Sequence, residues 1–305
     1  MIRRSPIDVK ALNSFLESVG SYSPNLIFTP GNLQAIFHYT DLNGLQGIIT
    51  NHDLWLTHSQ YSNDDEELTH GFAVVQETIG ELLAKARSKR RKDYLENVKN
   101  IIKSPLSKGV YICCFCEKDN LLSQWRSYSA NGNGVSLGFK PDGFSYITGP
   151  DSPPSGLVRL WKVFYERPKQ KNLVKLALEF AYKDKNEPSQ NFAKRAQQEA
   201  DAIQFFIPTF KNQDFEDEKE IRLIFTPFPN STIKPQFRVS RGMLVPYYSL
   251  KELHGSPSPR QLPITSLCVG PSVNKHLNLE SVKMLLTKIG YFQVAVGSSD
   301  TPYRG

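Results

Sequence analysis

The chain has 305 residues, of which 39% are hydrophobic and 11% aromatic, and its formal net charge is +7. This length suits one large α+β domain and the apolar content suits a packed core. No apolar run approaches the roughly 18 residues that a membrane-spanning helix needs, which excludes that class. The opening residues, MIRRSPIDVKALNSFLESVG, resemble an amphipathic helix more than a signal peptide, so we expect a cytoplasmic protein.

The first half of the chain predicts short strands around helices. We expect a helical extension over 1–25 and one α+β domain over 26–305. Within that domain, strands at 34–40 and 53–58 flank a helical turn. A long helical stretch follows from about 64 to 103, because its apolar side chains recur at three- and four-residue spacing.

The second half predicts strands and helices in irregular order. Strands are expected at GVYICCFCE, GNGVSLGFK, GLVRLWKVFYE, EKEIRLIFTP, FRVSRGMLVPYYSL, PITSLCVGP and FQVAVGSS. Helices are expected at NLLSQWRSYSANG, NLVKLALEFAY, QNFAKRAQQEADAIQFF and LESVKMLLTKIGY. No G-x-G-x-x-G follows the first strand and no phosphate-binding loop motif occurs. We therefore predict an α+β fold with a bent or split, mixed or mostly antiparallel sheet and helical insertions at about 64–103 and 172–210.

Three of the four cysteines, Cys113, Cys114 and Cys116, lie in one strand-like run, and Cys268 stands apart. Disulfide scaffolds spread their cysteines, and a zinc site needs a second pair or histidines at ligand spacing. We therefore interpret the cluster as small buried strand residues and expect no metal. A metal site or a reactive thiol is the alternative.

Glu218, Glu220 and Arg222 alternate along a predicted strand, which would place all three on one face. Such groups must be paired or exposed to solvent. In a cleft, one glutamate would orient a hydroxyl or stabilise a cationic transition state while Arg222 held its neighbour. The alternative is that these residues lie on a solvent-exposed strand edge and have no role in a site.

Three further constellations each allow a structural and a functional interpretation. His38 ends the first strand, and would bond either a backbone carbonyl or a sugar hydroxyl. Trp125 and Tyr128 lie one helical turn apart, and would either pack together or stack on a base or nicotinamide ring. Asn63 and Asp64 fit a helix cap, with Asp64 also able to line a pocket mouth.

A run of basic residues lies in AKARSKRRKDY. It could contact nucleic-acid phosphates or form the solvated face of a helix. Its members are Lys85, Arg87, Lys89, Arg90, Arg91 and Lys92.

Taken in order, the motifs resemble a bacterial domain-of-unknown-function family, the one numbered 2971. The resemblance covers about residues 36–304. It rests on FHYT, LQGIITNHDLWLTHSQYSNDDEE, CCFCEKDNLLSQWRSYSANGNGVSLGF, FEDEKEIRLIF, RGMLVPYY, ITSLCVGP and GSSDTPYR. The sequence departs from the family at Asp65, where proline is frequent, and at Cys116, where serine is usual.

That family in turn looks like a distant branch of the ADP-ribosyltransferase superfamily, whose split, bent antiparallel sheets grip NAD. The superfamily's pattern has a His or Arg on the first strand, a Tyr, Ser or Thr on the second, and a Glu on a later strand. The matching residues are His38 on the first strand, Thr57 or Ser59 with nearby Tyr61 on the second, and Glu220 preceded by Glu218 on the later one.

The resemblance implies a role for each of these residues. His38 would bond the ribose hydroxyls of NAD, and Tyr39 or Tyr61 would stack on nicotinamide. Glu220 would stabilise the oxocarbenium-like state. Glu218 or Asp64 would deprotonate the acceptor.

Three functions remain open. The first is an NAD-dependent ADP-ribosyltransferase or NAD glycohydrolase, which such families use as toxins or phage-defence effectors. Its acceptor would be a protein, or a nucleic acid held by the basic run. The second is a nucleic-acid-binding protein or metal-dependent nuclease using Asp64, Glu67, Glu218 and Glu220. The third is a catalytically inactive ligand-sensing or interaction module.

Overall fold

The computed structural model describes most of the chain. It covers residues 33–61, 67–102, 109–144, 155–180, 196–197, 200–201, 203–204, 206–228, 231–254 and 261–302. The predicted N-terminal helix, Asn63, Asp64 and the side chain of Glu67 lie outside these residues.

Within the described residues, ten strands form one mixed sheet, which confirms the predicted α+β class. Its main path runs β10–β9–β4–β1–β3–β2–β8–β7, with β6 paired to β3 and β5 paired to β6. All described pairings are antiparallel except that of β9 with β10. The strands are β1 (Ile36–Thr40), β2 (Trp55–His58), β3 (Tyr111–Cys116), β4 (Val135–Phe139), β5 (Gly156–Lys162), β6 (Glu220–Pro227), β7 (Gln236–Ser240), β8 (Met243–Ser249), β9 (Ile264–Val269) and β10 (Ala295–Ser298).

Strand β3 is the branch point of the sheet. β6 pairs with β3 along its whole length, from Tyr111 to Cys116. A strand has two edges, so β1 and β2 must share the other one. β1 meets it at Cys116, and β2 meets it at Tyr111 and Ile112. The sheet therefore divides at β3, with β1 continuing to β4 and β2 continuing to β8.

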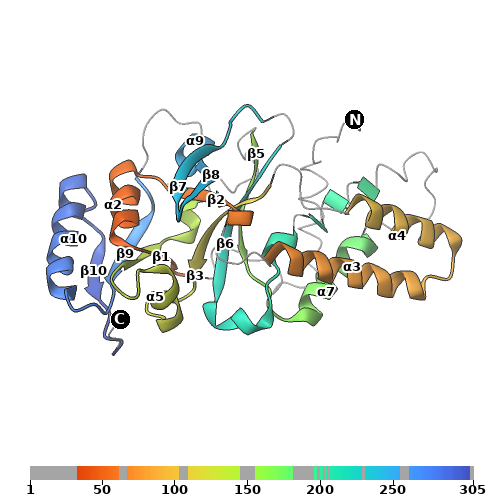
Figure 1. Cartoon of the computed structure of the whole chain (residues 1–305), viewed down its shortest axis with the longest axis horizontal. Coiled ribbons are helices and arrows are strands. Elements are labelled where there is room, and N and C mark those ends of the chain that lie inside the picture. Colours follow the sequence, from red (N-terminus) through yellow and green to blue (C-terminus); the bar gives the residue numbers. More distant parts are fainter. Residues whose placement is uncertain are drawn as a thin grey trace.

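Helices gather at the two ends of this sheet (Figure 1). α10 and α2 lie at one end, α5 lies beside β1, and α3, α4 and α7 lie together at the other end. The helices are α2 (Leu42–Asn51), α3 (Glu67–Lys85), α4 (Lys89–Ile101), α5 (Leu122–Tyr128), α7 (Arg167–Phe180), α9 (Leu250–His254) and α10 (Lys275–Ile289). Among the helices of the described ranges, none has the length and apolar character needed to cross a bilayer.

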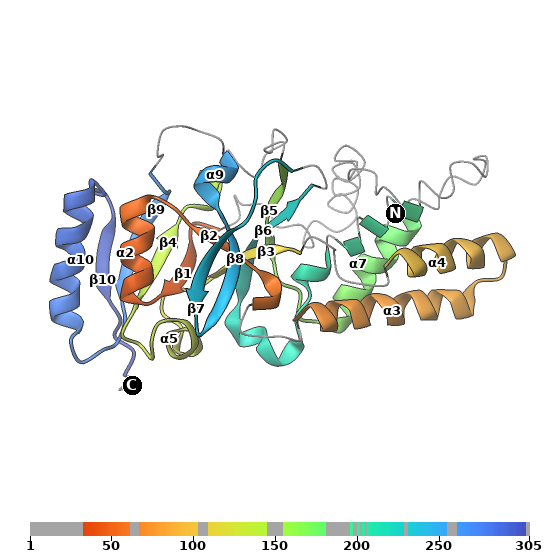
Figure 2. The ribbon, with the colours of Figure 1, turned by 45° about the horizontal axis from the view of Figure 1, so that its top comes forward.

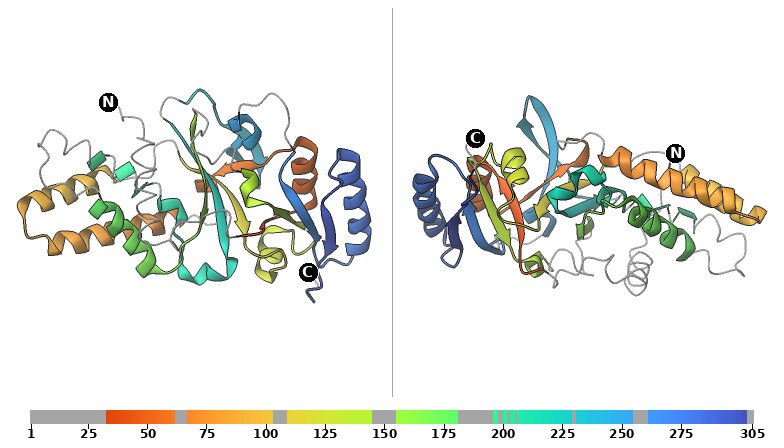
Figure 3. Two further views of the ribbon diagram at one scale, coloured as in Figure 1. Left: turned by 180° about the vertical axis from the view of Figure 1, so that it is seen from behind. Right: turned by 90° about the horizontal axis from the view of Figure 1, so that it is seen from below.

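The helical stretch predicted over about 64–103 consists of two helices, because the chain turns back between α3 and α4. α3 ends at Lys85 and α4 begins at Lys89. Ser88 caps α4, since its side-chain oxygen accepts the N–H of Arg91 at 3.2 Å. The two helices form a hairpin that reaches out from the sheet (Figure 3).

The single strand predicted at FRVSRGMLVPYYSL is also wrong, because it is a hairpin of β7 and β8 followed by α9. Arg241 and Gly242 form the turn, with φ values of 49° and 74°. This is the left-handed region that tight hairpin turns require. β7 lies at the end of the sheet path, beside β8 (Figure 2).

Alternation along the strands gives the sheet two faces, which we name after Leu223 and Glu220, both on β6. The Leu223 face carries the largest apolar core, which includes Ile36, Phe115 and Leu137. On the Glu220 face, α3, α4 and α7 cover a second core around Ile224. A third, smaller cluster on that face lies under α5 and is made of Tyr39, Cys116 and Trp125. The Glu220 face is therefore packed at two places, and the candidate site lies between them.

Candidate functional site

His38 lies on the Leu223 face of the sheet and is half-buried. Its Nδ1 lies 2.8 Å from the carbonyl oxygen of Cys114 and 3.9 Å from the Cys113 sulfur. Its ring packs edge-on to Phe115 at 5.8 Å. Burial lowers the pKa of His38, which favours the neutral ring donating Nδ1–H to the carbonyl. These contacts fit the structural interpretation of this histidine.

Glu220 lies on the opposite face, so the predicted pairing of His38 with Glu220 in one site is wrong. Phe37 pairs with Cys116, and Cys116 pairs with Glu220. Directly paired residues share a face, so Phe37 and Glu220 point the same way and His38 points the other way. The sheet separates the two side chains.

Two aromatic rings predicted to stack on a ligand are buried. Tyr39 is 6% exposed; its hydroxyl donates to the carbonyl of Lys118 at 2.8 Å and accepts the N–H of Leu121 at 2.9 Å. Trp125 has no exposed surface and packs edge-on to Tyr39 at 4.9 Å. Trp125 also donates to Asn120 at 2.8 Å. Both rings hold α5 to β1 and leave no face for a ligand.

Four charged residues form a compact group on the Glu220 face, which we call the carboxylate cluster: Lys211, Glu218, Glu220 and Arg222. Arg222 grips Glu220 with Nε and one terminal nitrogen, each 2.8 Å from a carboxylate oxygen. Lys211 lies between the two glutamates, 2.6 Å from Glu218 and 3.2 Å from Glu220. Two cations thus hold two carboxylates close together with no net charge.

Glu218 enters the cluster from a different element than predicted. It ends a 3-10 helix, η7 (Gln213–Glu218), and Lys219 then turns the chain with a φ of 46° before β6 begins at Glu220. The prediction that Glu218 lies on the strand is therefore wrong. Its side chain is 16% exposed, whereas Lys211, Glu220 and Arg222 are at most 6% exposed. Glu218 is the carboxylate of the cluster that meets solvent.

The electrostatics of the cluster keep Glu220 ionised. Burial alone would raise the pKa of Glu220, but the Arg222 guanidinium, aided by Lys211, outweighs it and holds that pKa at about 2. Glu220 therefore acts as a fixed negative charge rather than as a proton donor. The phenol of Tyr165 also accepts the backbone N–H of Glu220 at 2.8 Å.

Side chains from β3 and α5 border the cluster. The exposed thiol of Cys114 lies beside the Glu220 carboxylate. The Tyr128 hydroxyl donates to Glu218 at 3.4 Å, and burial raises the pKa of that phenol, which keeps its proton in place. Gln124 reaches the Glu218 carbonyl at 3.5 Å. Cys114 corrects the prediction that the strand cysteines are buried, whereas Cys113 and Cys116 confirm it.

Comparison with known families gives a match to the part of the chain that contains this cluster. Residues 124–223 match the family described as Protein of unknown function (DUF2971). The matched region is therefore similar to the DUF2971 family. The matched region contains Tyr128 and the whole carboxylate cluster. No curated protein and no solved structure matches the chain.

Other predicted site residues lie away from the carboxylate cluster. Thr57 is on the Glu220 face but pairs with Ile112, four residues along β3 from Cys116, which is about 14 Å. Tyr61 is 39% exposed and lies edge-on to His58 at 5.6 Å. Neither residue is brought to the cluster. Ser59, the alternative on the second strand, is buried.

Ligands for a metal do not assemble here. Within the described ranges, no group of three His, Cys, Asp or Glu side chains is arranged to hold a metal ion. The nuclease hypothesis placed Glu218 and Glu220 around a cation, but Lys211 and Arg222 occupy that position. Its other acids, Asp64 and Glu67, have side chains outside the described residues.

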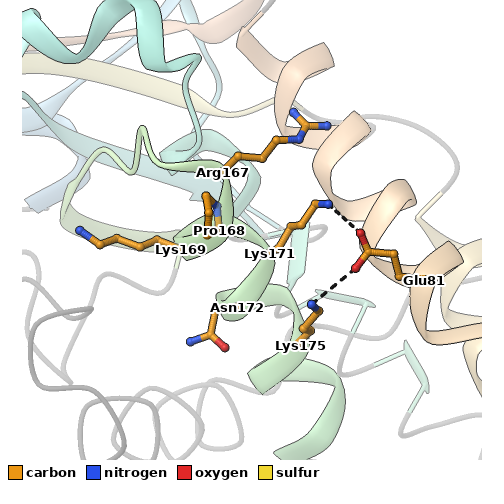
Figure 4. Close-up of a pocket in the computed structure, with 7 residues that line it drawn as sticks. All are labelled: Glu81, Arg167, Pro168, Lys169, Lys171, Asn172 and Lys175. Carbon is orange, nitrogen blue, oxygen red and sulfur yellow. Dashed lines mark hydrogen bonds and ion pairs between the residues drawn. The ribbon is translucent and has the colours of Figure 1, made fainter. Parts of the chain in front are cut away.

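A hollow lies on α7 next to α3. It encloses about 640 Å³, and Figure 4 shows the side chains around it. Lys171 and Lys175 reach Glu81 at 2.7 and 3.5 Å, and Arg167 pairs with Glu77. The full lining is Glu81, Arg167, Pro168, Lys169, Lys171, Asn172 and Lys175.

The predicted basic run lies at the turn between α3 and α4, within the group of helices α3, α4 and α7 that we call the helical arm. Five of its members are exposed: Lys85, Arg87, Lys89, Arg90 and Lys92. Arg91 instead folds back over the ring of Tyr94 and reaches the carbonyl of Leu178 on α7. The run is thus mainly a solvated surface, with one arginine fastening α4 to α7.

Sequence reasoning missed Lys211, Trp55 and Arg238. Lys211 follows the apolar run FFIPTF and is 3% exposed, and such a lysine needs an acidic partner. That mismatch was the available signal. Trp55 and Arg238 are far apart in the sequence, and only the fold brings them into contact.

Proposed function

We propose that the chain is an NAD-consuming glycosyl-transfer enzyme, an ADP-ribosyltransferase or NAD glycohydrolase, whose reacting carboxylate is Glu218. The observation that carries this proposal is the carboxylate cluster itself. It holds a glutamate side chain at a partly exposed position, fixed by Lys211 and faced by the Tyr128 hydroxyl. The division of the sheet at β3 supports an ADP-ribosyltransferase-like fold.

The chemistry explains why a fixed carboxylate matters. When the bond between ribose C1′ and the nicotinamide nitrogen breaks, the electron pair leaves with nicotinamide and positive charge develops on the ribose. Glu218 would accept a hydrogen bond from a ribose hydroxyl and stabilise that positive charge. A carboxylate that is already oriented pays no reorganisation cost at that moment. Water or another acceptor then attacks C1′ and releases its proton to solvent.

The neighbouring residues have supporting roles in this proposal. Glu220 and Arg222 form the rigid base against which Lys211 orients Glu218. Tyr128 orients the other carboxylate oxygen. Tyr39 and Trp125 hold α5, and thereby Tyr128, against the sheet. The four free cysteines agree with action in the reducing cytoplasm.

The test is nicotinamide release from NAD by the purified full-length chain, with label in the ADP-ribose part. Incubations contain buffer alone, DNA, RNA or a cell lysate. Label released as free ADP-ribose identifies a glycohydrolase, and label on a macromolecule identifies a transferase and its acceptor class. Glu218→Gln should abolish release. Its matched control is Glu216→Gln, since Glu216 lies on the same short helix and pairs only at the surface with Lys219.

A second function, nucleic-acid binding, is favoured by the charge of the helical arm. Residues 67–102 and 167–180 hold eleven Lys and Arg against six Asp and Glu. That excess of five is most of the net charge of +7. Basic surfaces of this kind attract phosphate backbones. The arm would serve either as a binding surface alone or as the acceptor surface of the enzyme.

A further inference from the structure

A separate group of side chains on the Glu220 face surrounds Arg238 at the edge of the sheet. Arg238 donates to the Thr57 hydroxyl at 3.2 Å, and its guanidinium carbon lies 5.5 Å from the centre of the Trp55 ring. Trp55 also packs against Tyr247, with ring centres 4.4 Å apart. The three strands β7, β8 and β2 therefore converge on one arginine.

Arg238 carries a charge without an acidic partner. Among the described residues, no carboxylate lies within ion-pair distance of it. Its Nε is buried and has no hydrogen-bond partner. A partly buried cation with an unsatisfied hydrogen-bond donor raises the free energy of the folded chain. Binding of an anion that accepts this hydrogen bond would recover that free energy. The arrangement is that of a recognition site rather than of a structural ion pair.

We propose that Arg238, Thr57 and Trp55 form a binding site for the phosphate group of a nucleotide. A guanidinium offers a planar fork of donors that matches phosphate oxygens. The Thr57 hydroxyl adds a neutral donor beside it. Trp55 is 41% exposed, which gives an aromatic surface next to the phosphate position for the base or sugar.

This site stands apart from the carboxylate cluster. Thr57 lies about 14 Å along β3 from the position of Glu220. Nucleotide binding at Arg238 needs no turnover at Glu218, so the two proposals fail independently. If both hold, the phosphate site serves as a second anchor on the same face as the proposed reaction centre.

The experiment is a titration of the full-length chain with ADP, followed by calorimetry and by tryptophan emission. Trp55 is the exposed tryptophan, whereas Trp125 and Trp161 are buried, so a ligand at this site should change the Trp55 emission. Adenosine and inorganic phosphate are titrated separately. Arg238→Gln is compared with Arg241→Gln, which removes the same charge from the exposed turn of the same hairpin.

The expected result is ADP binding that weakens roughly tenfold or more in Arg238→Gln, as loss of a charged hydrogen bond predicts, and is unchanged in Arg241→Gln. Arg238→Lys should bind ADP with an affinity between those of the wild type and Arg238→Gln, because lysine keeps the charge but lacks the planar fork of donors. Adenosine and inorganic phosphate should each bind more weakly than ADP. The proposal is overturned by equal ADP affinity in wild type and Arg238→Gln, by no ADP binding, or by inorganic phosphate binding as tightly as ADP.

Discussion

His38 and Glu220 project from opposite faces of the same sheet. The register fixes this relationship, since Phe37 pairs with Cys116 and Cys116 pairs with Glu220. Two residues that a resemblance would place around one ribose are thus separated by the backbone of β1, β3 and β6. The chemistry must be assigned to one face, and the paired carboxylates lie on the Glu220 face.

Replacing the buried carboxylate should destabilise the fold. Glu220→Gln leaves the Arg222 guanidinium, which is 1% exposed, without its anion. Breaking a buried ion pair in this way costs roughly 3–5 kcal/mol. Urea denaturation should show a loss in free energy of unfolding of that order. A midpoint equal to that of the wild type would show that the pair does not support the fold.

Removing the Tyr39 hydroxyl, which holds α5 against β1, should also lower the stability of the fold. Tyr39→Phe deletes both the donor to the Lys118 carbonyl and the acceptor of the Leu121 N–H. Leaving buried backbone groups unsatisfied costs about 1–3 kcal/mol. Tyr39→Phe should therefore have a lower melting temperature than the wild type. Tyr61→Phe, which changes a partly exposed ring, should have the wild-type melting temperature. Equal melting of the two variants would contradict the anchoring role.

Stability should fall on acidification in a way that depends on His38. Burial holds its pKa in the folded state below the ordinary 6.5, so the folded chain binds fewer protons than the unfolded one. This contribution is complete above pH 6.5 and is lost as pH falls through the lowered pKa. His58 acts in the same direction, since burial lowers its pKa too.

The measurement is the free energy of unfolding at pH 7.5 and at pH 5. The drop between them should be smaller in His38→Gln than in the wild type. His276→Gln, at an exposed position on α10, should leave the drop unchanged. A His38 variant with the full wild-type drop would show that this ring does not titrate with folding.

The helical arm should bind nucleic acid with a steep salt dependence. Lys89→Gln with Arg90→Gln should weaken binding to DNA or RNA and lower the slope of log K against log salt by about 0.7–0.9 per lost phosphate contact. Both residues are exposed at the start of α4. Lys283→Gln, on α10 at the other end of the sheet, is the control. An unchanged slope in the arm variant would show that its charge is only a solvated surface.

The sequence predicted the elements better than their relations. Apolar spacing located most strands and helices, but residues 87–93 between α3 and the apolar face of α4 are all polar or charged, so no apolar pattern there marked the turn. At the site, alternation correctly placed Glu220 and Arg222 together. It failed for Glu218, because Lys219 adopts a left-handed conformation that ends the strand pattern.

The face on which His38 lies was beyond sequence reasoning. It depends on the register of β1 against β3 and of β3 against β6, between residues far apart in the chain. A shift of one residue in either register would move His38 to the other face. The same holds for Lys211 and Arg238, whose partners come from distant segments.

Nicotinamide release from NAD, measured side by side for wild type, Glu218→Gln and His38→Gln at a temperature where all three are folded, tests the central claim most directly. If the carboxylate cluster is the reaction centre, Glu218→Gln should release no nicotinamide and His38→Gln should still release it. Release that survives in Glu218→Gln and disappears in His38→Gln, or no release by the wild type, would contradict it.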